Sequence, residues 1–190
     1  MTELTRANLK HHFLIAMPSM SDPNFAHSIT YVCEHNAEGA MGIVINRPMD
    51  LSVGDILSHL NIEDYDGRFD DMAVMCGGPV QVERGFVLHR EPSTKWDSSL
   101  EVEDGISLTS SRDILMAIAN NEGPKESLVA LGYAGWSAGQ LDEEMAQNAW
   151  LSVQADPDII FSTPTEQRWQ AAAKLLGVDM ALLSDQIGHA

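Results

Sequence analysis

Short apolar runs, each closed by turn-forming residues, restrict the fold of this chain more than any other feature. The three clearest runs span residues 41–45, 73–76 and 128–134. They are followed by Asn46-Arg47-Pro48, Gly77-Gly78-Pro79 and Gly135-Trp136-Ser137. A run this short, bounded by glycine, proline or asparagine, is typical of a β-strand that is buried on both faces. The sequence therefore predicts a sheet with buried central strands.

Further strands are predicted around these three. Residues 12–17 and 85–89 are apolar, and residues 159–161 form a weaker apolar run. Residues 27–35 alternate in type, as expected of a strand with two unlike faces. One face carries Ile29, Tyr31 and Cys33, and the other carries Ser28, Thr30 and Glu34, with Val32 as the exception.

Helices are expected where capping residues precede apolar residues at helical spacing, at 52–60, 111–121 and 137–146. Thr163-Pro164-Thr165-Glu166 combines a capping box with proline at the first helical position, so a last helix is expected there. No linker or repeat divides the chain. We expect a single domain over residues 1–190, with an α+β or mixed α/β fold: a mixed, partly antiparallel sheet with flanking helices.

The chain carries a large excess of negative charge. It has 28 acidic residues against 11 lysines and arginines, and its formal net charge is −17. A surface of this sign repels the phosphates of nucleic acids and the headgroups of anionic membranes. Neither a nucleic acid nor a membrane is therefore expected as a binding partner.

No export signal is predicted from the sequence. The one apolar run near its start, residues 13–17, is too short for the core of a signal peptide. Cys33 and Cys76 are the only cysteines. We expect a cytoplasmic protein in which both are free thiols, with Cys33 mostly buried.

The sharpest chemical motif is Gly135-Trp136-Ser137-Ala138-Gly139, which matches the Gly-x-Ser-x-Gly turn of serine hydrolases. A serine nucleophile needs a base, and the only histidine after Ser137 is His189, next to the end of the sequence. Ser137 and Gln140 also have the spacing of a capping box, so the hydroxyl is expected to accept a hydrogen bond from a backbone N–H of residues 138–140. A serine hydrolase using Ser137 is kept as an alternative to this helix cap.

A thiol or metal site around Cys33 and Cys76 is a second alternative. Cys33 and His35 would lie on the same face of a strand, about 7 Å apart. No pair of cysteines and histidines has zinc-finger spacing, however, and a buried cysteine more often behaves as a small apolar side chain. No metal and no cofactor is expected.

Four blocks of sequence resemble one family. They are residues 17–27 with 33–36 and 39–48, residues 77–80 with 85–89, residues 132–141 with 148–151, and residues 187–190. They include the segments Gly39-Ala40-Met41-Gly42, Gly77-Gly78-Pro79-Val80 and Gly132-Tyr133-Ala134-Gly135-Trp136-Ser137. In these blocks the chain resembles the AlgH/YqgE family of bacterial proteins. The resemblance implies a cytosolic α/β protein without assigned catalytic residues. One branch of the family carries the label of a transcriptional regulator of alginate biosynthesis, and at a net charge of −17 such regulation is expected to be indirect.

The expected function is that of a regulatory or binding module acting through a small ligand or a protein partner. Crevices in such sheets form beyond the carboxyl ends of strands, where Arg47 could pair with an anionic group and Trp136 offers a flat apolar wall. We predict that Asn46, Arg47, Gly78 and Trp136 line one shared cleft. The candidate ligand-binding residues are Asn46, Arg47, Gly77, Gly78, Pro79, Trp136 and Gln140. The alternative is that the three segments are only tight turns and that Trp136 belongs to the core.

Overall fold

The computed structural model describes residues 8–63, 67–90 and 96–178. Its strands are β1 (His12–Ala16), β2 (Ile29–Asn36), β3 (Gly39–Val44), β4 (Pro48–Ser52), β5 (Ala73–Cys76), β6 (Val80–Arg90), β7 (Ser99–Glu103), β8 (Ile106–Thr109), β9 (Ser127–Ser137) and β10 (Trp150–Gln154). Its α-helices are α1 (Val53–His59), α2 (Arg112–Ala119), α3 (Gln140–Ala146), α4 (Pro157–Phe161) and α5 (Arg168–Leu175), and a 3-10 helix (Thr165–Gln167) precedes α5. The predicted combination of a sheet with flanking helices is confirmed, and sheet dominates. None of the helices in these described ranges is long and apolar enough to cross a membrane.

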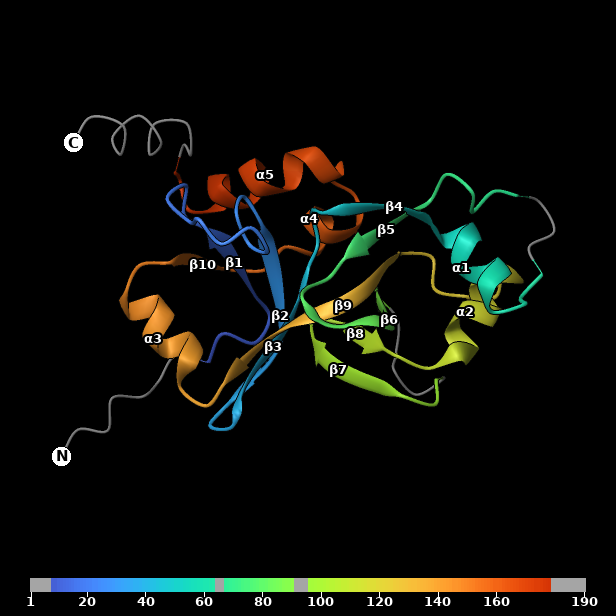
Figure 1. Cartoon of the computed structure of the whole chain (residues 1–190), viewed down its shortest axis with the longest axis horizontal. Coiled ribbons are helices and arrows are strands. Elements are labelled where there is room, and N and C mark those ends of the chain that lie inside the picture. Colours follow the sequence, from blue (N-terminus) through green and yellow to red (C-terminus); the bar gives the residue numbers. More distant parts are fainter. Residues whose placement is uncertain (1–7, 64–66, 91–95, 179–190) are drawn as a thin grey trace.

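Strand β9 joins two halves of one sheet. The strand order is β10-β1-β2-β3-β9-β6-β8-β7, and β5, which pairs with β4, also pairs with β9. The first half of β9 pairs with β5 and β6, whereas its second half pairs with β3. Among the described strands every pairing is antiparallel except that of β5 with β9. In Figure 1, β9 runs through the centre of the molecule, with β1, β2, β3 and α3 on one side and α1 and α2 on the other.

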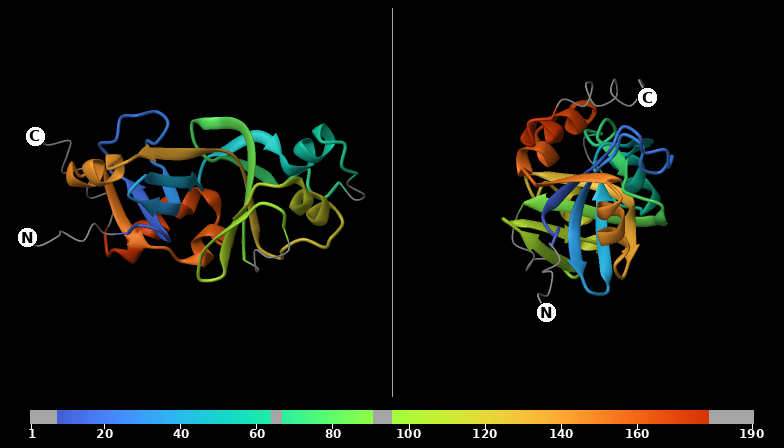
Figure 2. Two further views of the ribbon diagram at one scale, coloured as in Figure 1. Left: turned by 90° about the horizontal axis from the view of Figure 1, so that it is seen from below. Right: turned by 90° about the vertical axis from the view of Figure 1, so that its left-hand side faces the viewer.

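The helices cover both faces of the curled sheet. Residues of α4 and α5 pack into the largest core cluster, α1 and α2 pack into a second cluster, and α3 contributes to a third. Figure 2 shows α3 and the α1–α2 pair near opposite ends of the long axis, with the sheet between them.

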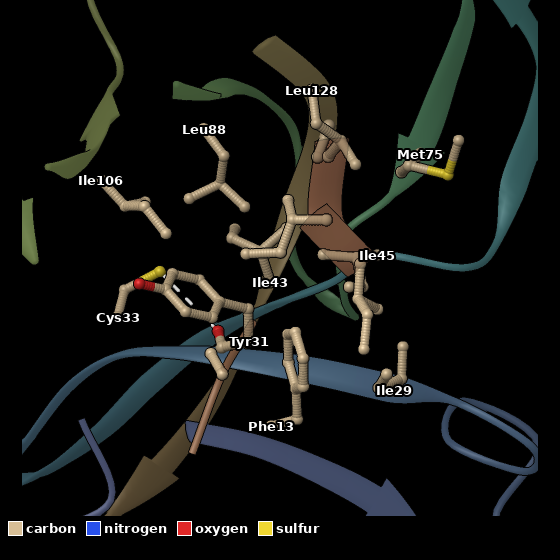
Figure 3. Close-up of a cluster of buried hydrophobic side chains, with 14 of the residues drawn as sticks. Phe13, Ile29, Tyr31, Cys33, Ile43, Ile45, Met75, Leu88, Ile106 and Leu128 are labelled. Carbon is tan, nitrogen blue, oxygen red and sulfur yellow. Dashed lines mark hydrogen bonds between the residues drawn. The ribbon is translucent and has the colours of Figure 1, made fainter. Parts of the chain in front are cut away.

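Alternation along β2 divides its side chains between two of these clusters. Ile29, Tyr31 and Cys33 enter the largest cluster, as predicted. Figure 3 shows this cluster between β2 and β3 on one side and strands of the other half of the sheet on the other. Val32 points to the opposite face and packs with Trp136 in the third cluster. Its apolar character is thereby explained, since both faces of β2 are covered.

Helix α1 confirms its predicted start. The Ser52 hydroxyl accepts a hydrogen bond from the Asp55 N–H at 3.0 Å, and the Asp55 carboxylate accepts one from the Ser52 N–H at 2.9 Å, which completes a capping box.

Two other local predictions are wrong. Residues 159–161 belong to α4, not to a strand, because the Asp156 carboxylate caps the Asp158 N–H and Pro157 occupies the first helical position. Thr163 does not cap the last helix: its hydroxyl donates to the Asp158 carbonyl at 3.2 Å. The chain instead enters α5 through the 3-10 helix, which has no side-chain cap.

Candidate functional site

Asn46 and Arg47 bind the backbone of the loop that precedes β2. The Asn46 side chain accepts from the Ile29 N–H at 3.0 Å and donates to the His27 carbonyl at 2.9 Å. The Arg47 guanidinium donates to the carbonyls of Pro23 and Ala26, both at 2.7 Å. These bonds fix the loop against the end of β3, so both side chains have a structural task.

Gly77 and Gly78 let the chain cross over β9. The Gly77 N–H donates to the Leu131 carbonyl at 2.8 Å, and Val80 then pairs with Tyr133 as part of β6. Between these points the chain passes over β9 in close contact. A Cβ on Gly78 would lie 2.1 Å from the Tyr133 carbonyl carbon, and one on Gly77 would lie 2.3 Å from the Gly132 carbonyl oxygen. The glycines are therefore required by the approach of two backbones, and Pro79, which follows, is exposed.

Trp136 is largely part of the core, as the alternative interpretation predicted. Its side chain is 6% exposed. It stacks on Phe25 with ring centroids 6.3 Å apart and meets Trp150 edge-on at 6.2 Å. The loop held by Asn46 and Arg47 thus also contacts Trp136, through Phe25. One half-buried acid, Glu144, lies nearby: desolvation raises the pKa of its carboxyl, and the side chains of Trp150, Trp136 and Gln140 offset only part of that rise.

Ser137 is bound to Gln140, but not in the predicted direction. The Ser137 N–H and hydroxyl both donate to the Gln140 Oε1, at 3.0 and 3.2 Å. Ser137 is the last residue of β9, and the N-cap of α3 is Gly139. The predicted acceptance by the Ser137 hydroxyl is therefore wrong. An amide oxygen cannot take the proton that a nucleophilic serine must lose, and His189 lies outside the described residues.

Cys33 and Cys76 are free thiols, as predicted. Cys33 is fully buried and its thiol donates to the Tyr31 carbonyl across 3.7 Å. Burial raises the pKa of the Cys33 thiol far above its ordinary value, so it stays protonated at neutral pH. Within residues 8–63, 67–90 and 96–178 no group of three or more His, Cys, Asp or Glu side chains is arranged to hold a metal ion.

A wide groove of about 850 Å³ lies where the two halves of the sheet meet. One wall is the β2–β3 hairpin, within residues 34–41, and the other wall comes from β6 and from residues 97–110. Tyr133, Gly135 and Trp136 of β9 lie between these walls. Of the seven predicted ligand-binding residues, only Trp136 lines this groove. The structure does not bring Asn46, Arg47 and Gly78 into it, because their side chains or backbones are used in the contacts described above.

The groove carries more negative than positive charge. Its walls include the carboxylates of Glu34, Glu38 and Asp97, which are all exposed, and one guanidinium, that of Arg84. The Arg84 side chain lies over the Phe86 ring at 5.2 Å and donates to the Ser110 hydroxyl at 3.3 Å. The single cation of the groove is thus held against its own wall, and the charged residues that line the opposite wall, Glu34 and Glu38, are both acidic.

A second cavity, of about 760 Å³, lies between α1, α2 and β6. Its lining is mainly apolar and includes Ile56, Leu60, Val82 and Leu115. Next to it, Gly85 leaves open space, since a Cβ there would meet only the Leu131 side chain, at 3.9 Å.

Sequence reasoning missed the residues that form the acidic groove. Glu34 and Glu38 flank the β2–β3 turn, and Asp97 precedes β7, which was not predicted. One signal was present. Asp104-Gly105 joins β7 to β8, and both residues have positive φ, 54° and 75°. An Asp-Gly pair between two strands is a strong hairpin signal and would have located this wall.

Comparisons with known proteins show the family to which the chain belongs. A family model described as AlgH-like, DUF179, matches residues 13–181. A UPF0301 protein of Thioalkalivibrio sulfidiphilus is 58% identical over 184 residues, which cover 97% of this chain and 98% of that protein. A UPF0301 protein of Saccharophagus degradans is 56% identical over 183 residues, covering 96% of this chain and 89% of that protein.

Two solved structures share the fold. A protein of Corynebacterium diphtheriae matches with a TM-score of 0.73 over 93% of this chain and 91% of its own. Its sequence identity is 18%, so this match shows a shared fold alone. The solution structure of AlgH from Pseudomonas aeruginosa matches with a TM-score of 0.80 and 49% identity over the whole of both chains. The chain described here belongs to the AlgH-like family.

Proposed function

We propose that this protein is a binding module whose acidic groove takes a positively charged segment of a protein partner. The observation that carries the proposal is the groove of about 850 Å³ with three exposed carboxylates and one guanidinium on its walls. A lysine- or arginine-bearing segment would find complementary charge there, and the net charge of −17 would speed its approach over a longer range.

Regulation, on this proposal, acts through the partner and not through contact with DNA. The same charges that attract a basic segment repel the phosphate backbone. Two free thiols, one of them fully buried, suit the reducing conditions of the cytoplasm, where such a partner would be met.

The test is binding of a capped hexapeptide of alternating lysine and threonine, measured by isothermal titration calorimetry at low and at physiological salt. We expect binding that weakens as salt rises, and no binding of the matching glutamate–threonine peptide. The double variant Glu34→Gln, Glu38→Gln should weaken binding about fivefold, because each exposed ion pair contributes about 0.5 kcal/mol.

The matched control is Glu63→Gln with Glu122→Gln, which removes the same charge at exposed positions outside the groove. Equal losses from both double variants would mean that only net charge matters, and the proposed site would be wrong. Absence of binding at low salt would refute the proposal as a whole.

The second cavity favours a second candidate, binding of a small apolar molecule. Its mainly apolar lining is typical of small-ligand pockets. If that cavity binds ligand, it should take up the dye 1-anilinonaphthalene-8-sulfonate with a rise in fluorescence. Gly85→Val, which adds a side chain beside the cavity, should lower that signal, and an unchanged signal would contradict this candidate.

A further inference from the structure

The second half of β9 has a strand on only one of its two sides. Gly135 pairs with Met41 of β3 on one side. On the other side β6 reaches β9 first at the Val80–Tyr133 pair, because the preceding chain crosses over β9 at Gly78 and does not run along it. Within the described residues no strand is paired to Gly135 on the side of β6.

The free side of Gly135 carries a backbone donor and acceptor. In an antiparallel pair, the N–H and C=O groups of alternate residues point to the same neighbour. Tyr133 is paired toward β6, and the Ser137 N–H donates to the Gln140 side chain. Gly135 lies between Tyr133 and Ser137 in this alternation, so its N–H and C=O also point toward the side of β6. The neighbouring residue points the other way, since a Cβ on Gly39 of β3 would lie 2.2 Å from the Trp136 carbonyl oxygen.

This free side opens into the acidic groove. Gly135 is exposed, lines the groove and has no side chain to block an approaching backbone. An exposed strand edge with unpaired N–H and C=O groups is a template for a further strand. The place is short, because Val80 occupies the position opposite Tyr133 and α3 begins at Gln140.

We propose that the partner segment binds by strand addition at Gly135. Its backbone pairs with the Gly135 N–H and C=O, and its basic side chains face the carboxylates of Glu34 and Glu38. This inference rests on the proposed function and adds the mode of recognition: the backbone supplies the register, and the carboxylates select lysine and arginine.

The experiment follows hydrogen exchange of the Gly135 amide by NMR while the lysine–threonine hexapeptide is added to the full chain. Strand addition predicts that this exchange slows by about tenfold or more when the peptide saturates the protein, since the N–H becomes hydrogen-bonded. A hexapeptide with N-methylated backbone nitrogens keeps its charge but cannot donate, and should bind about tenfold more weakly.

Two substitutions give a matched pair. Gly135→Ala keeps the N–H, and its Cβ would meet the Tyr133 and Val80 side chains at 3.4 and 3.7 Å, so it should bind within about twofold of wild type. Gly135→Pro removes the N–H and should weaken binding about tenfold. The exchange and N-methyl measurements use the wild-type chain, so they decide the matter even if Gly135→Pro does not fold.

The outcomes separate the two proposals. In one outcome, binding depends on salt and is weakened by Glu34→Gln with Glu38→Gln, but exchange at Gly135 is unchanged and the N-methylated peptide binds with equal affinity. That outcome would overturn strand addition and leave the acidic groove as the site. If neither the lysine–threonine hexapeptide nor its N-methylated form binds, both the acidic groove and strand addition are overturned.

Discussion

Replacing Gly78 with alanine tests whether the crossing over β9 holds the two halves of the sheet in place. The added Cβ would lie 2.1 Å from the Tyr133 carbonyl carbon, 2.2 Å from its oxygen and 2.4 Å from the Ala134 nitrogen. All three are backbone atoms of a central strand that is paired on both sides of the crossing, by β6 and β3. No side chain can move aside to make room.

The cost of Gly78→Ala has two parts. Forcing an extra methyl group into a packed interior costs about 1–3 kcal/mol, and the backbone contact places this case at the upper end. Gly78 also has a φ of +153°, which a residue with a Cβ rarely adopts. Holding alanine in this conformation adds roughly another 1 kcal/mol to the cost. The expected loss is about 4 kcal/mol in the free energy of unfolding, a large share of the stability of an ordinary domain.

Urea denaturation followed by circular dichroism measures this loss. With a dependence on urea of about 2 kcal/mol per molar, the midpoint should fall by roughly 2 M. Gly105→Ala is the control, because Gly105 also has a positive φ, +75°, but its Cβ would meet nothing within 4 Å. It should cost about 1 kcal/mol, the conformational part alone. If Gly78→Ala destabilises no more than Gly105→Ala, the crossing is not a tight contact and the reasoning is refuted.

Four further results are expected. Arg168→Ala should lower the free energy of unfolding by about 3 kcal/mol in the same urea assay, because the buried guanidinium donates to the Ile45 carbonyl and to the Thr163 carbonyl at 3.0 Å. Arg168→Lys should restore little of this stability, since an ammonium lacks the planar fork of a guanidinium. Ser137→Ala should cost less than about 0.5 kcal/mol and leave no change in fluorophosphonate labelling, because the Ser137 hydroxyl donates to an amide oxygen, which is no base. Covalent labelling of Ser137 would contradict this. Glu144→Gln should stabilise the protein at neutral pH but not in acid. Because the pKa of the Glu144 carboxyl is raised in the folded state, its contribution to stability is fully present below the unfolded pKa and is lost as pH rises through the folded pKa. A pH series of unfolding midpoints for wild type and variant checks the sign. The isolated protein should show no sub-micromolar, sequence-selective binding to duplex DNA at physiological salt in a mobility-shift or anisotropy assay.

The apolar runs predicted the strands well, because burial on both faces leaves a strong local signal. Residues 73–76 coincide with β5, and residues 128–134 lie within β9. Strands β4, β7, β8 and β10 were missed. Of these, β7 is an edge strand with exposed Glu101 and Glu103 and has no apolar run of its own. Residues 159–161 show the opposite error: an apolar run too short to reveal its period was assigned by composition, and the Asp156-Pro157 start that makes it a helix was overlooked.

The candidate site was harder to predict than the strands, because the partners of its residues are distant in sequence. Arg47 does donate hydrogen bonds to oxygen acceptors, as a guanidinium should, but these are neutral carbonyls 21 and 24 residues away in its own chain. Nothing local distinguishes such a partner from a ligand. The acidic wall had the same problem: Glu34 and Glu38 lie on the hairpin of β2 and β3, and Asp97 lies far along the sequence, so only the fold brings their charges to one groove.

Gly77-Gly78-Pro79 nevertheless bears on binding, by a route that the sequence did not suggest. The glycines do not line the acidic groove. They let the chain cross β9, so β6 begins at Val80 and leaves the side of Gly135 without a strand. A segment that ran along β9 in place of crossing it would fill that side with the protein's own backbone. The close contact that makes Gly78 intolerant of a side chain is therefore also what keeps the edge open. It follows that Gly78 substitutions should impair stability and strand addition together, whereas Gly135→Ala and Gly135→Pro differ in binding without touching the crossing.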